Sequence, residues 1–137
     1  MLTPSARAFL AKHEAHFTRD PLFGCWLWQE KDIDRHGYGT LWGKGGPRQA
    51  HREMYRELVG PIPEGRVLDH LCRNRACVRP DHLDPVKGSE NDLRRSWRYR
   101  ARQSKCSKGH DMSTCVTTPA GGRICRRCNE ESPWRNT

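Results

Sequence analysis

An aspartate followed directly by a histidine, Asp69-His70, is the pair of side chains in this sequence best suited to hydrolytic chemistry. Cleaving a phosphodiester needs a cation that stabilises the charge of the transition state and a base that deprotonates the attacking water. A carboxylate is a hard oxygen ligand, and an imidazole has an unperturbed pKa that suits a base near neutral pH. The side-chain oxygen of Asn91 could bind the same cation. These three residues form the predicted active site.

Two groups of cysteines and histidines have the composition of zinc sites. The first consists of two close pairs separated by a loop: Cys106 with His110, and Cys125 with Cys128. Four nitrogen and sulfur ligands in this pattern suit a closed tetrahedral zinc site, and thiolates disfavour magnesium. Cys115 lies between the pairs and could replace His110. Because residues 104–137 show little apolar periodicity, we expect them to fold around this metal.

The second group would pin the arginine-rich loop after His70 to an upstream segment. Its four candidate ligands are Cys25, Cys72, Cys77 and His82. A Cys3His zinc site is one interpretation, and buried reduced thiols or a local disulfide are the alternatives. If these residues bind zinc, His82 is structural.

The composition favours metal ligands over disulfides. Of the 137 residues, 34% are hydrophobic and 30% are charged, so burial alone would stabilise a core weakly. No apolar stretch reaches the roughly 18 residues of a membrane span, and the first residues lack the apolar run of a signal peptide. We therefore expect a soluble cytoplasmic protein without a membrane partner, in which the seven cysteines stay reduced.

The positive charge lies mainly in the last third of the chain. Residues 1–93 contain 14 Lys and Arg against 13 Asp and Glu, whereas residues 94–137 contain 11 against 3. So strong a segregation indicates a polyanionic partner such as nucleic acid. A solvated basic surface without a partner is the alternative.

The segment around the Asp-His pair is predicted to fold as strand, loop, strand and helix. Residues 66–70 and 82–86 have the pattern of two strands, joined by a loop rich in Arg and Asn. Ser89 can cap a helix that runs from about residue 90 to residue 100. Adjacent side chains on a strand point to opposite faces, so the Asp-His pair can act together only where the strand ends and twists into the loop.

The upstream half is predicted to supply a peripheral helix, a hairpin and a second helix. Residues 4–17 have a weak helical pattern. Residues 25–28 and 38–42 are typical of two hairpin strands. Residues 50–59 have helical spacing and stop at Gly60, and their apolar side is expected to cover the hairpin.

With these motifs the sequence resembles the HNH endonucleases, particularly the forms found in phages and in intron-borne homing or nicking enzymes. The resemblance covers roughly residues 24–95 and implies an α+β fold in which a ββα-metal motif, or His-Me finger, carries the site. The residues that carry the resemblance are Ala50-His51-Arg52, Gly60-Pro61-Ile62-Pro63-Glu64-Gly65, Leu68-Asp69-His70-Leu71-Cys72-Arg73-Asn74, Pro80-Asp81-His82-Leu83-Asp84-Pro85-Val86 and Glu90-Asn91.

The resemblance assigns roles to the site residues. The histidine of the family's pair is the general base, which falls on His70, and the aspartate before it is a metal ligand, which falls on Asp69. The last family position falls on Asn91, so Mg²⁺ or Mn²⁺ is expected at Asp69 and Asn91. Where the family has an asparagine that braces the loop of the base, this chain has His82. His82 could therefore brace His70, bind zinc, or belong to a decayed site.

The function implied is a metal-dependent endonuclease that nicks or cuts double-stranded DNA. The resemblance is compatible with a phage-encoded protein that acts in the host cell, and a homodimer is one assembly that it allows. The flanking phosphates would be held by Arg73, Arg75, Arg94, Arg95 and Arg98. The alternative is a non-catalytic, zinc-containing DNA-binding or packaging-accessory module, which the unusual His82 supports.

We expect two folded parts. A nuclease domain over residues 1–93, with its ββα core at about residues 66–100, precedes a basic helix end and linker at residues 94–103. A zinc minidomain then occupies residues 104–137. This last part resembles the zinc-ribbon or knuckle units that often follow phage HNH domains, and its motif residues are Lys108-Gly109-His110 and Arg126-Arg127.

Overall fold

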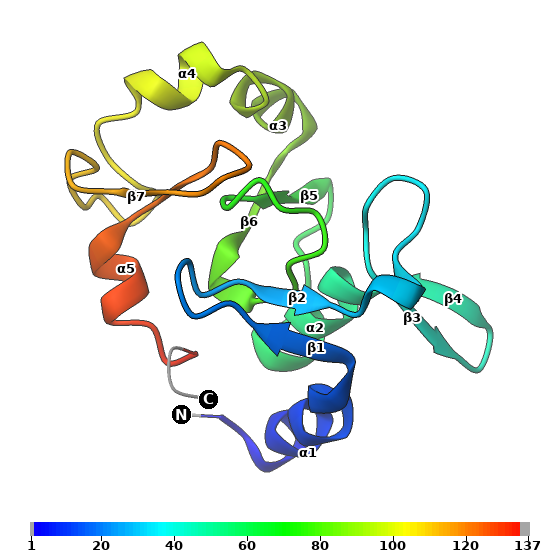
Figure 1. Cartoon of the computed structure of the whole chain (residues 1–137). Coiled ribbons are helices and arrows are strands. Elements are labelled where there is room, and N and C mark those ends of the chain that lie inside the picture. The colour runs from blue at the N-terminus through cyan, green and yellow to red at the C-terminus, as the bar shows by residue number, and fades with distance from the viewer. Residues whose placement is uncertain (1, 135–137) are drawn as a thin grey trace.

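The computed structural model describes residues 2–134 and has an α+β architecture (Figure 1). Its helices are α1 (Pro4–His13), η1 (Glu14–His16), η2 (Glu30–Asp32), α2 (Ala50–Leu58), η3 (Pro80–His82), α3 (Gly88–Arg94), α4 (Trp97–Arg102) and α5 (Arg126–Glu130). Its strands are β1 (Phe17–Arg19), β2 (Trp26–Trp28), β3 (Thr40–Gly43), β4 (Gly46–Gln49), β5 (Arg66–His70), β6 (Leu83–Lys87), β7 (Val116–Thr117) and β8 (Arg123–Ile124). Within the described residues the strands form antiparallel pairs, β1–β2, β3–β4, β5–β6 and β7–β8.

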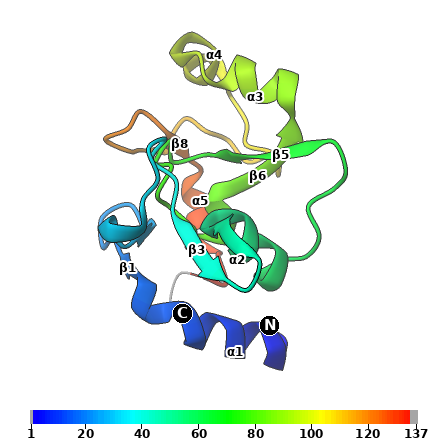
Figure 2. The same ribbon diagram turned by 90° about the vertical axis from the view of Figure 1, so that its right-hand side faces the viewer.

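The predicted strand, loop, strand and helix are confirmed as β5, the loop after it, β6 and α3. In the β5–β6 pair Asp69 lies opposite Asp84, and His70 lies opposite Leu83. Helix α3 begins directly after β6 and packs on both strands. Figure 2 shows the β5–β6 pair between α1 at one end of the molecule and α3 with α4 at the other. The ββα motif therefore has the elements that the family resemblance implies.

The single helix predicted after the second strand is wrong, because the chain forms two short helices there. Helix α3 ends at Arg94, and α4 begins at Trp97 after an extended Ser96. The Arg100 guanidinium donates hydrogen bonds of 2.8 Å to the carbonyl oxygens of Arg94 and Arg95. These bonds satisfy carbonyl groups at the end of α3, which a continuous helix would have satisfied from its own backbone.

The predicted upstream hairpin is also wrong, because its two strands pair with other partners. Strand β2 pairs with β1, whose first residue, Phe17, was assigned to the end of the first helix, and β3 pairs with β4. The Asp34 carboxylate accepts hydrogen bonds from the backbone of His36 and Tyr38, which stabilises a turn between β2 and β3. Gly45 and Gly46 have φ angles of 93° and 104°, so the chain reverses within a segment whose composition is typical of a loop.

The main core lies between α1, α2 and the β1–β2 pair. Its buried members are Ala6, Leu10, Phe17, Trp26, Trp28, Ala50, Met54, Leu58, Val78 and Trp134. Phe17 stacks on Trp26 with 5.0 Å between ring centroids. Trp134 meets Trp26 edge-on, with 5.9 Å between ring centroids. The end of the described chain therefore helps to close the core of the first part.

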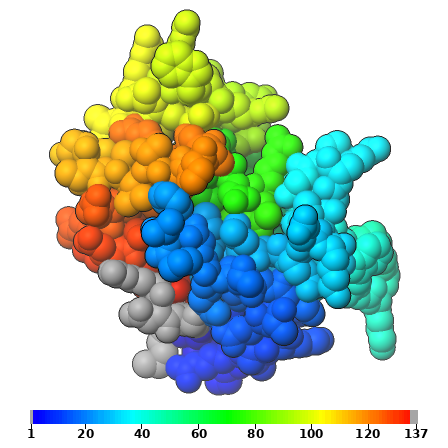
Figure 3. All heavy atoms as spheres, viewed as in Figure 1, coloured from blue at the N-terminus to red at the C-terminus, as the bar shows by residue number. Residues whose placement is uncertain are grey.

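The C-terminal part also packs on the loop that follows β5. The Thr118 hydroxyl donates a 2.6 Å hydrogen bond to the carbonyl oxygen of Cys72. A Cβ atom on Gly122 would lie 2.4 Å from backbone atoms of Leu71 and Cys72. The backbone around Gly122 is therefore in direct contact with the backbone of the loop after β5. Ile124 is buried in a cluster with Cys25, Cys72 and Cys77. Figure 3 shows the C-terminal part lying against the segment around residue 20.

Candidate active site and metal centres

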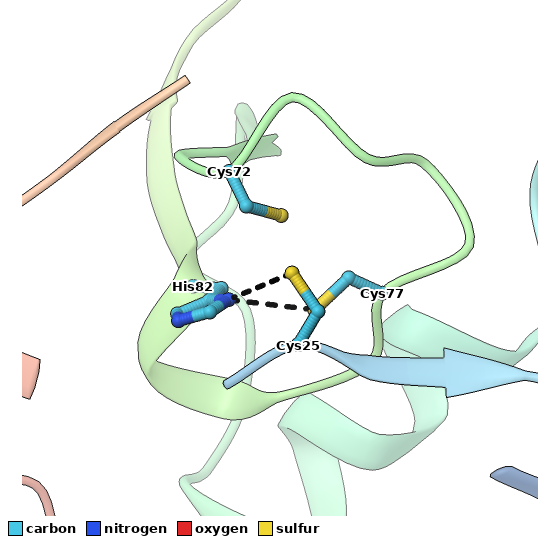
Figure 4. A group of neighbouring side chains, drawn as sticks. All are labelled: Cys25, Cys72, Cys77 and His82. Atoms are coloured by element: carbon cyan, nitrogen blue, oxygen red, sulfur yellow. Dashed lines mark hydrogen bonds between the residues drawn. The ribbon is translucent and has the colours of Figure 1, made fainter. Parts of the chain in front are cut away.

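Four buried ligands from three parts of the chain meet beside β2 (Figure 4). Cys25 directly precedes β2, Cys72 and Cys77 lie in the loop after β5, and His82 ends η3. Their ligand atoms all lie within 4.8 Å of one another. Nδ1 of His82 is 3.6 Å from the sulfur of Cys25 and 3.5 Å from that of Cys77. This group, the first Cys/His cluster, could hold a metal ion.

The three thiols of the first cluster have pKa values that are shifted in opposite directions. Hydrogen bonds from Cys25 and Cys77 lower the pKa of Cys72 well below its ordinary value. The hydrogen bond with Cys72 raises the pKa of Cys25 to about 12, and burial raises the pKa of Cys77. Nearby thiols that stabilise one thiolate beside an imidazole suit a soft divalent cation, which would displace the remaining protons. The donor set therefore fits zinc.

The second Cys/His cluster lies in the C-terminal part and consists of Cys106, His110, Cys125 and Cys128. Its ligand atoms also lie within 4.8 Å of one another. Nδ1 of His110 is 3.2 Å from the sulfur of Cys128 and 3.6 Å from that of Cys125. Cys115, the alternative ligand, instead accepts a 3.2 Å hydrogen bond from Arg123. The geometry thus favours His110 as the fourth ligand of a group that could bind zinc.

Strand β5 ends at His70, whose imidazole is fixed by the loop of the first cluster. Nε2 of His70 lies 3.1 Å from the carbonyl oxygen of Cys77. A carbonyl oxygen only accepts, so Nε2 carries the proton and Nδ1 is the nitrogen with the available lone pair. Burial lowers the pKa of His70 below its ordinary value. The imidazole is therefore neutral near pH 7 and can accept a proton at Nδ1.

Two aromatic residues from the upstream part pack near the His70 ring. His51, in the first turn of α2, lies 4.8 Å from His70 between ring centroids, and Tyr38 stacks on His51 at 5.3 Å. The His51 side chain is buried, and its Nδ1 has no hydrogen-bond partner among residues 2–134. Burial, followed by the charge that His70 can carry, lowers the pKa of His51 to about 3. His51 is therefore a neutral packing surface for His70.

The Asp69 carboxylate lies in a different environment from the His70 ring. Arg73 donates hydrogen bonds of 2.9 and 3.3 Å to its two oxygens. Arg94 donates a further bond of 3.2 Å to Oδ2. The Asp69 side chain is only 1% exposed. A cation bound at Asp69 would have to replace at least one of these ion pairs.

Residues 48–93 match the family model described as HNH endonuclease. We refer to these residues, which match that model, as the HNH domain. The match runs from the end of β4 to the last turn of α3 and so includes both His51 and His70. It also includes three of the four ligands of the first Cys/His cluster, since only Cys25 lies upstream.

The chain is also similar to proteins of two phages. Protein 7.7 of Escherichia phage T7 is 33% identical over 85 residues, which cover 62% of each chain. Protein 2.8 of the same phage is 29% identical over 92 residues, 66% of this chain and 58% of that protein. The gene 5.3 protein of Enterobacteria phage T3 is 46% identical over 36 residues, 26% of this chain and 36% of that protein. The chain therefore spans less than two thirds of the length of these relatives.

Two further searches gave negative results. No solved structure matches the chain significantly. Within the described residues, no helix combines the length and the apolar character needed to cross a membrane.

Helix α3 of the HNH domain carries Asn91 in a half-buried position. The helix packs on β5, the strand that ends at His70. The two predicted site residues thus come from elements that are in direct contact. The ring of His70 and the carboxylate of Asp69, by contrast, have separate hydrogen-bond partners.

The five arginines predicted to hold DNA phosphates fall into two groups. Two of them, Arg73 and Arg94, are paired internally with Asp69. The other three are exposed: Arg75, Arg95 and Arg98. Only the exposed group has guanidinium groups available to a ligand without breaking a buried ion pair.

Sequence reasoning missed two residues beside the site. Asp84 lies opposite Asp69 and shares the Arg94 guanidinium with it, at 2.7 Å. The predicted strand pairing could have revealed Asp84, because two carboxylates facing each other across strands need a cation between them. Tyr38 lies 5.9 Å from His70 between ring centroids. No local pattern pointed to Tyr38, because its contact with His70 joins segments that are far apart in the sequence.

We predict two zinc ions per chain, one for each Cys/His cluster. A structural zinc contributes on the order of 10 kcal/mol of folding free energy, so both sites should be nearly full in protein purified without chelator. Elemental analysis should give two zinc ions for the wild type and one for each of two variants, Cys72→Ser/Cys77→Ser and Cys125→Ser/Cys128→Ser. Cys115→Ser is the control and should keep both. A Cys125→Ser/Cys128→Ser variant that retains two zinc ions would contradict the second site.

Burial of His51 predicts an acid sensitivity of folding. Its folded pKa of about 3 lies below the unfolded value, so protonation favours the unfolded chain. The stabilising contribution is present above about pH 6.5 and is lost as the pH falls toward 3, by roughly 2 kcal/mol between pH 7 and pH 5.

Denaturant unfolding of His51→Leu at these two pH values should show a smaller loss of stability than the wild type. His36→Leu, which changes an exposed histidine, is the matched control and should follow the wild type. Equal pH dependence in the wild type and the His51 variant would show that His51 does not resist protonation.

Proposed function

We propose that this chain is a metal-dependent DNA endonuclease in which His70 is the general base. The hydrogen bond between Nε2 of His70 and the carbonyl of Cys77 carries this proposal, because it leaves Nδ1 as the proton acceptor. His51 packs against the ring and limits its rotation. Phosphodiester hydrolysis needs such an oriented, neutral base beside the attacking water.

A divalent cation such as Mg²⁺ or Mn²⁺ would supply charge stabilisation at the scissile phosphate. Asn91 is the residue proposed to hold it, through its side-chain oxygen. Mg²⁺ characteristically keeps several water ligands and takes others from substrate phosphates, so a single protein ligand is compatible with its chemistry. Asp69, the other expected ligand, has both oxygens bonded to guanidinium groups. Its carboxylate does not fit a cation in this arrangement.

The DNA would lie across the exposed basic residues near the HNH domain. Arg75 donates a 2.9 Å hydrogen bond to the carbonyl of His36, and its guanidinium lies 5.3 Å from the centre of the Tyr38 ring. Because Tyr38 packs near His70, this arginine could contact a phosphate close to the site. Arg95 and Arg98 extend the positive charge along the segment that follows. The charge of residues 94–137 supports double-stranded DNA as the substrate.

We further propose that the second Cys/His cluster and one zinc ion organise residues 104–134 as a zinc-dependent unit. Its contacts with the Cys72 carbonyl and with Trp26 support a second role beside DNA binding. By packing on the loop of the first cluster, this unit would stiffen the segment that holds His70. The alternative of a non-catalytic module rested on His82, and the position of His82 among three cysteines offers a structural reason for that histidine.

Cleavage of supercoiled plasmid tests the proposed function. The wild type should relax or linearise the plasmid with Mg²⁺ or Mn²⁺ and should be inactive with EDTA. His70→Ala should lower the rate by at least about 100-fold, because a general base typically contributes a factor of 10² to 10⁴. DNA affinity should change little, since the imidazole contributes proton transfer rather than charge contacts.

His36→Ala serves as the matched control, because His36 is exposed and is not among the packed rings of Tyr38, His51 and His70. It should cleave at nearly the wild-type rate. Near-normal cleavage by His70→Ala would refute the assignment of the base. Plasmid binding without any cleavage by the wild type would favour the non-catalytic alternative.

A further inference from the structure

A network of charged side chains surrounds the buried carboxylate of Asp69. The guanidinium of Arg94 reaches three carboxylates, with bonds of 3.2 Å to Asp69, 2.7 Å to Asp84 and 2.9 Å to Glu90. Arg73 completes the group by pairing with Asp69. The Arg94 side chain is only 10% exposed. These ions form a connected network rather than separate surface pairs.

The network connects the three elements of the ββα motif. Asp69 comes from β5, Asp84 from β6, and Glu90 with Arg94 from α3. Burial lowers the pKa of Arg94, but pairing with Asp84 and then with Asp69 and Glu90 outweighs this effect and raises it above the ordinary value. The guanidinium is therefore charged at neutral pH, and its ion pairs join α3 to both strands.

Helical geometry extends this attachment to Asn91. Residues three apart lie on the same side of a helix, so Arg94 and Asn91 have the same general direction on α3. Fixing Arg94 on Asp69 and Asp84 thus fixes the rotation of the helix about its own axis. That rotation decides whether the Asn91 side chain is presented toward the end of β5.

The same contacts argue against a cation on Asp69. A divalent ion at this carboxylate would face the positive charges of Arg73 and Arg94 within hydrogen-bonding distance of the same oxygens. Displacing Arg94 would leave a buried guanidinium with fewer partners and two further carboxylates less well paired. Each of these changes opposes binding of the cation.

We propose that Asp69 and Arg94 form a clamp that positions Asn91, and that Asp69 is a positioning residue rather than a ligand of the catalytic cation. The proposal rests on the proposed function for the role of Asn91. The clamp itself is a property of the fold and can be measured without any cleavage.

Three variants and one control test the clamp: Asp69→Asn, Arg94→Met, the double variant and Arg95→Met. Arg95 is on the same part of the chain but is largely exposed and makes only a 3.7 Å ion pair with Asp92. Each single variant should lower Tm by about 10 °C, the size expected when one partner of a buried ion pair is removed. The double variant should be no less stable than the worse single variant, because the two residues act as one unit. Arg95→Met should leave Tm within about 2 °C of the wild type.

Cation binding distinguishes a clamp from a ligand. Mn²⁺ can be titrated into each protein while NMR follows paramagnetic broadening of the Asn91 side-chain amide. A clamp predicts that Arg94→Met and Asp69→Asn weaken Mn²⁺ binding by a similar factor, since both release α3. If Asp69 were a ligand masked by Arg94, Arg94→Met would tighten binding while Asp69→Asn weakened it at least tenfold. That opposite pair of shifts would overturn the proposal.

Arg94→Lys keeps the test decisive if Arg94→Met does not fold. Lysine retains one charge but cannot reach three carboxylates at once, so Tm and Mn²⁺ affinity should lie between those of the wild type and Asp69→Asn. Mn²⁺ binding tighter than in the wild type would contradict the clamp here too. Failure of the wild type to cleave DNA would overturn the proposed function alone, because stability and Mn²⁺ binding still decide the clamp.

Discussion

The hydrogen bond between His70 and the carbonyl of Cys77 is the contact on which the proposed chemistry depends. It fixes the tautomer of the imidazole, and it connects the imidazole to the loop that follows β5. That loop is held by the first Cys/His cluster and by backbone hydrogen bonds to β2, in which Trp28 donates to Ala76 and Val78 donates to Trp26. A metal in the cluster would therefore act on catalysis through the position of one carbonyl group, without touching the substrate.

The two faces of the β5–β6 pair have different environments. Neighbouring residues on a strand point to opposite sides, and His70 meets His51 and Tyr38 while Asp69 meets Arg73 and Arg94. One side thus carries a neutral aromatic environment for a base, and the other carries the ion pairs that attach α3. The C-terminal part adds a third constraint on the loop between β5 and β6, because the Thr118 hydroxyl donates a hydrogen bond to the carbonyl oxygen of Cys72 in that loop.

Much of this arrangement could be predicted from the sequence, because its signals are local. The spacing of Cys72, Cys77 and His82 and the pattern of strand, loop, strand and helix need only a short stretch of chain. The pairing of β1 with β2 could not be predicted in the same way, since Phe17 meets Trp28 through contacts that depend on the whole core. The charges of Arg73 and Arg94 were equally visible, but charge alone does not distinguish an arginine facing DNA from one buried against carboxylates. The folded structure decides that question, because it places Asp69 against both arginines and Asp84 against Arg94.

The protonation state of His70 in the folded protein tests the central claim most directly. Long-range ¹H–¹⁵N NMR correlations at neutral pH report which ring nitrogen carries the proton. We expect a neutral imidazole that is protonated at Nε2 and unprotonated at Nδ1 in zinc-loaded wild-type protein. A ring protonated at Nδ1 would contradict the hydrogen bond to Cys77 and remove the proposed base.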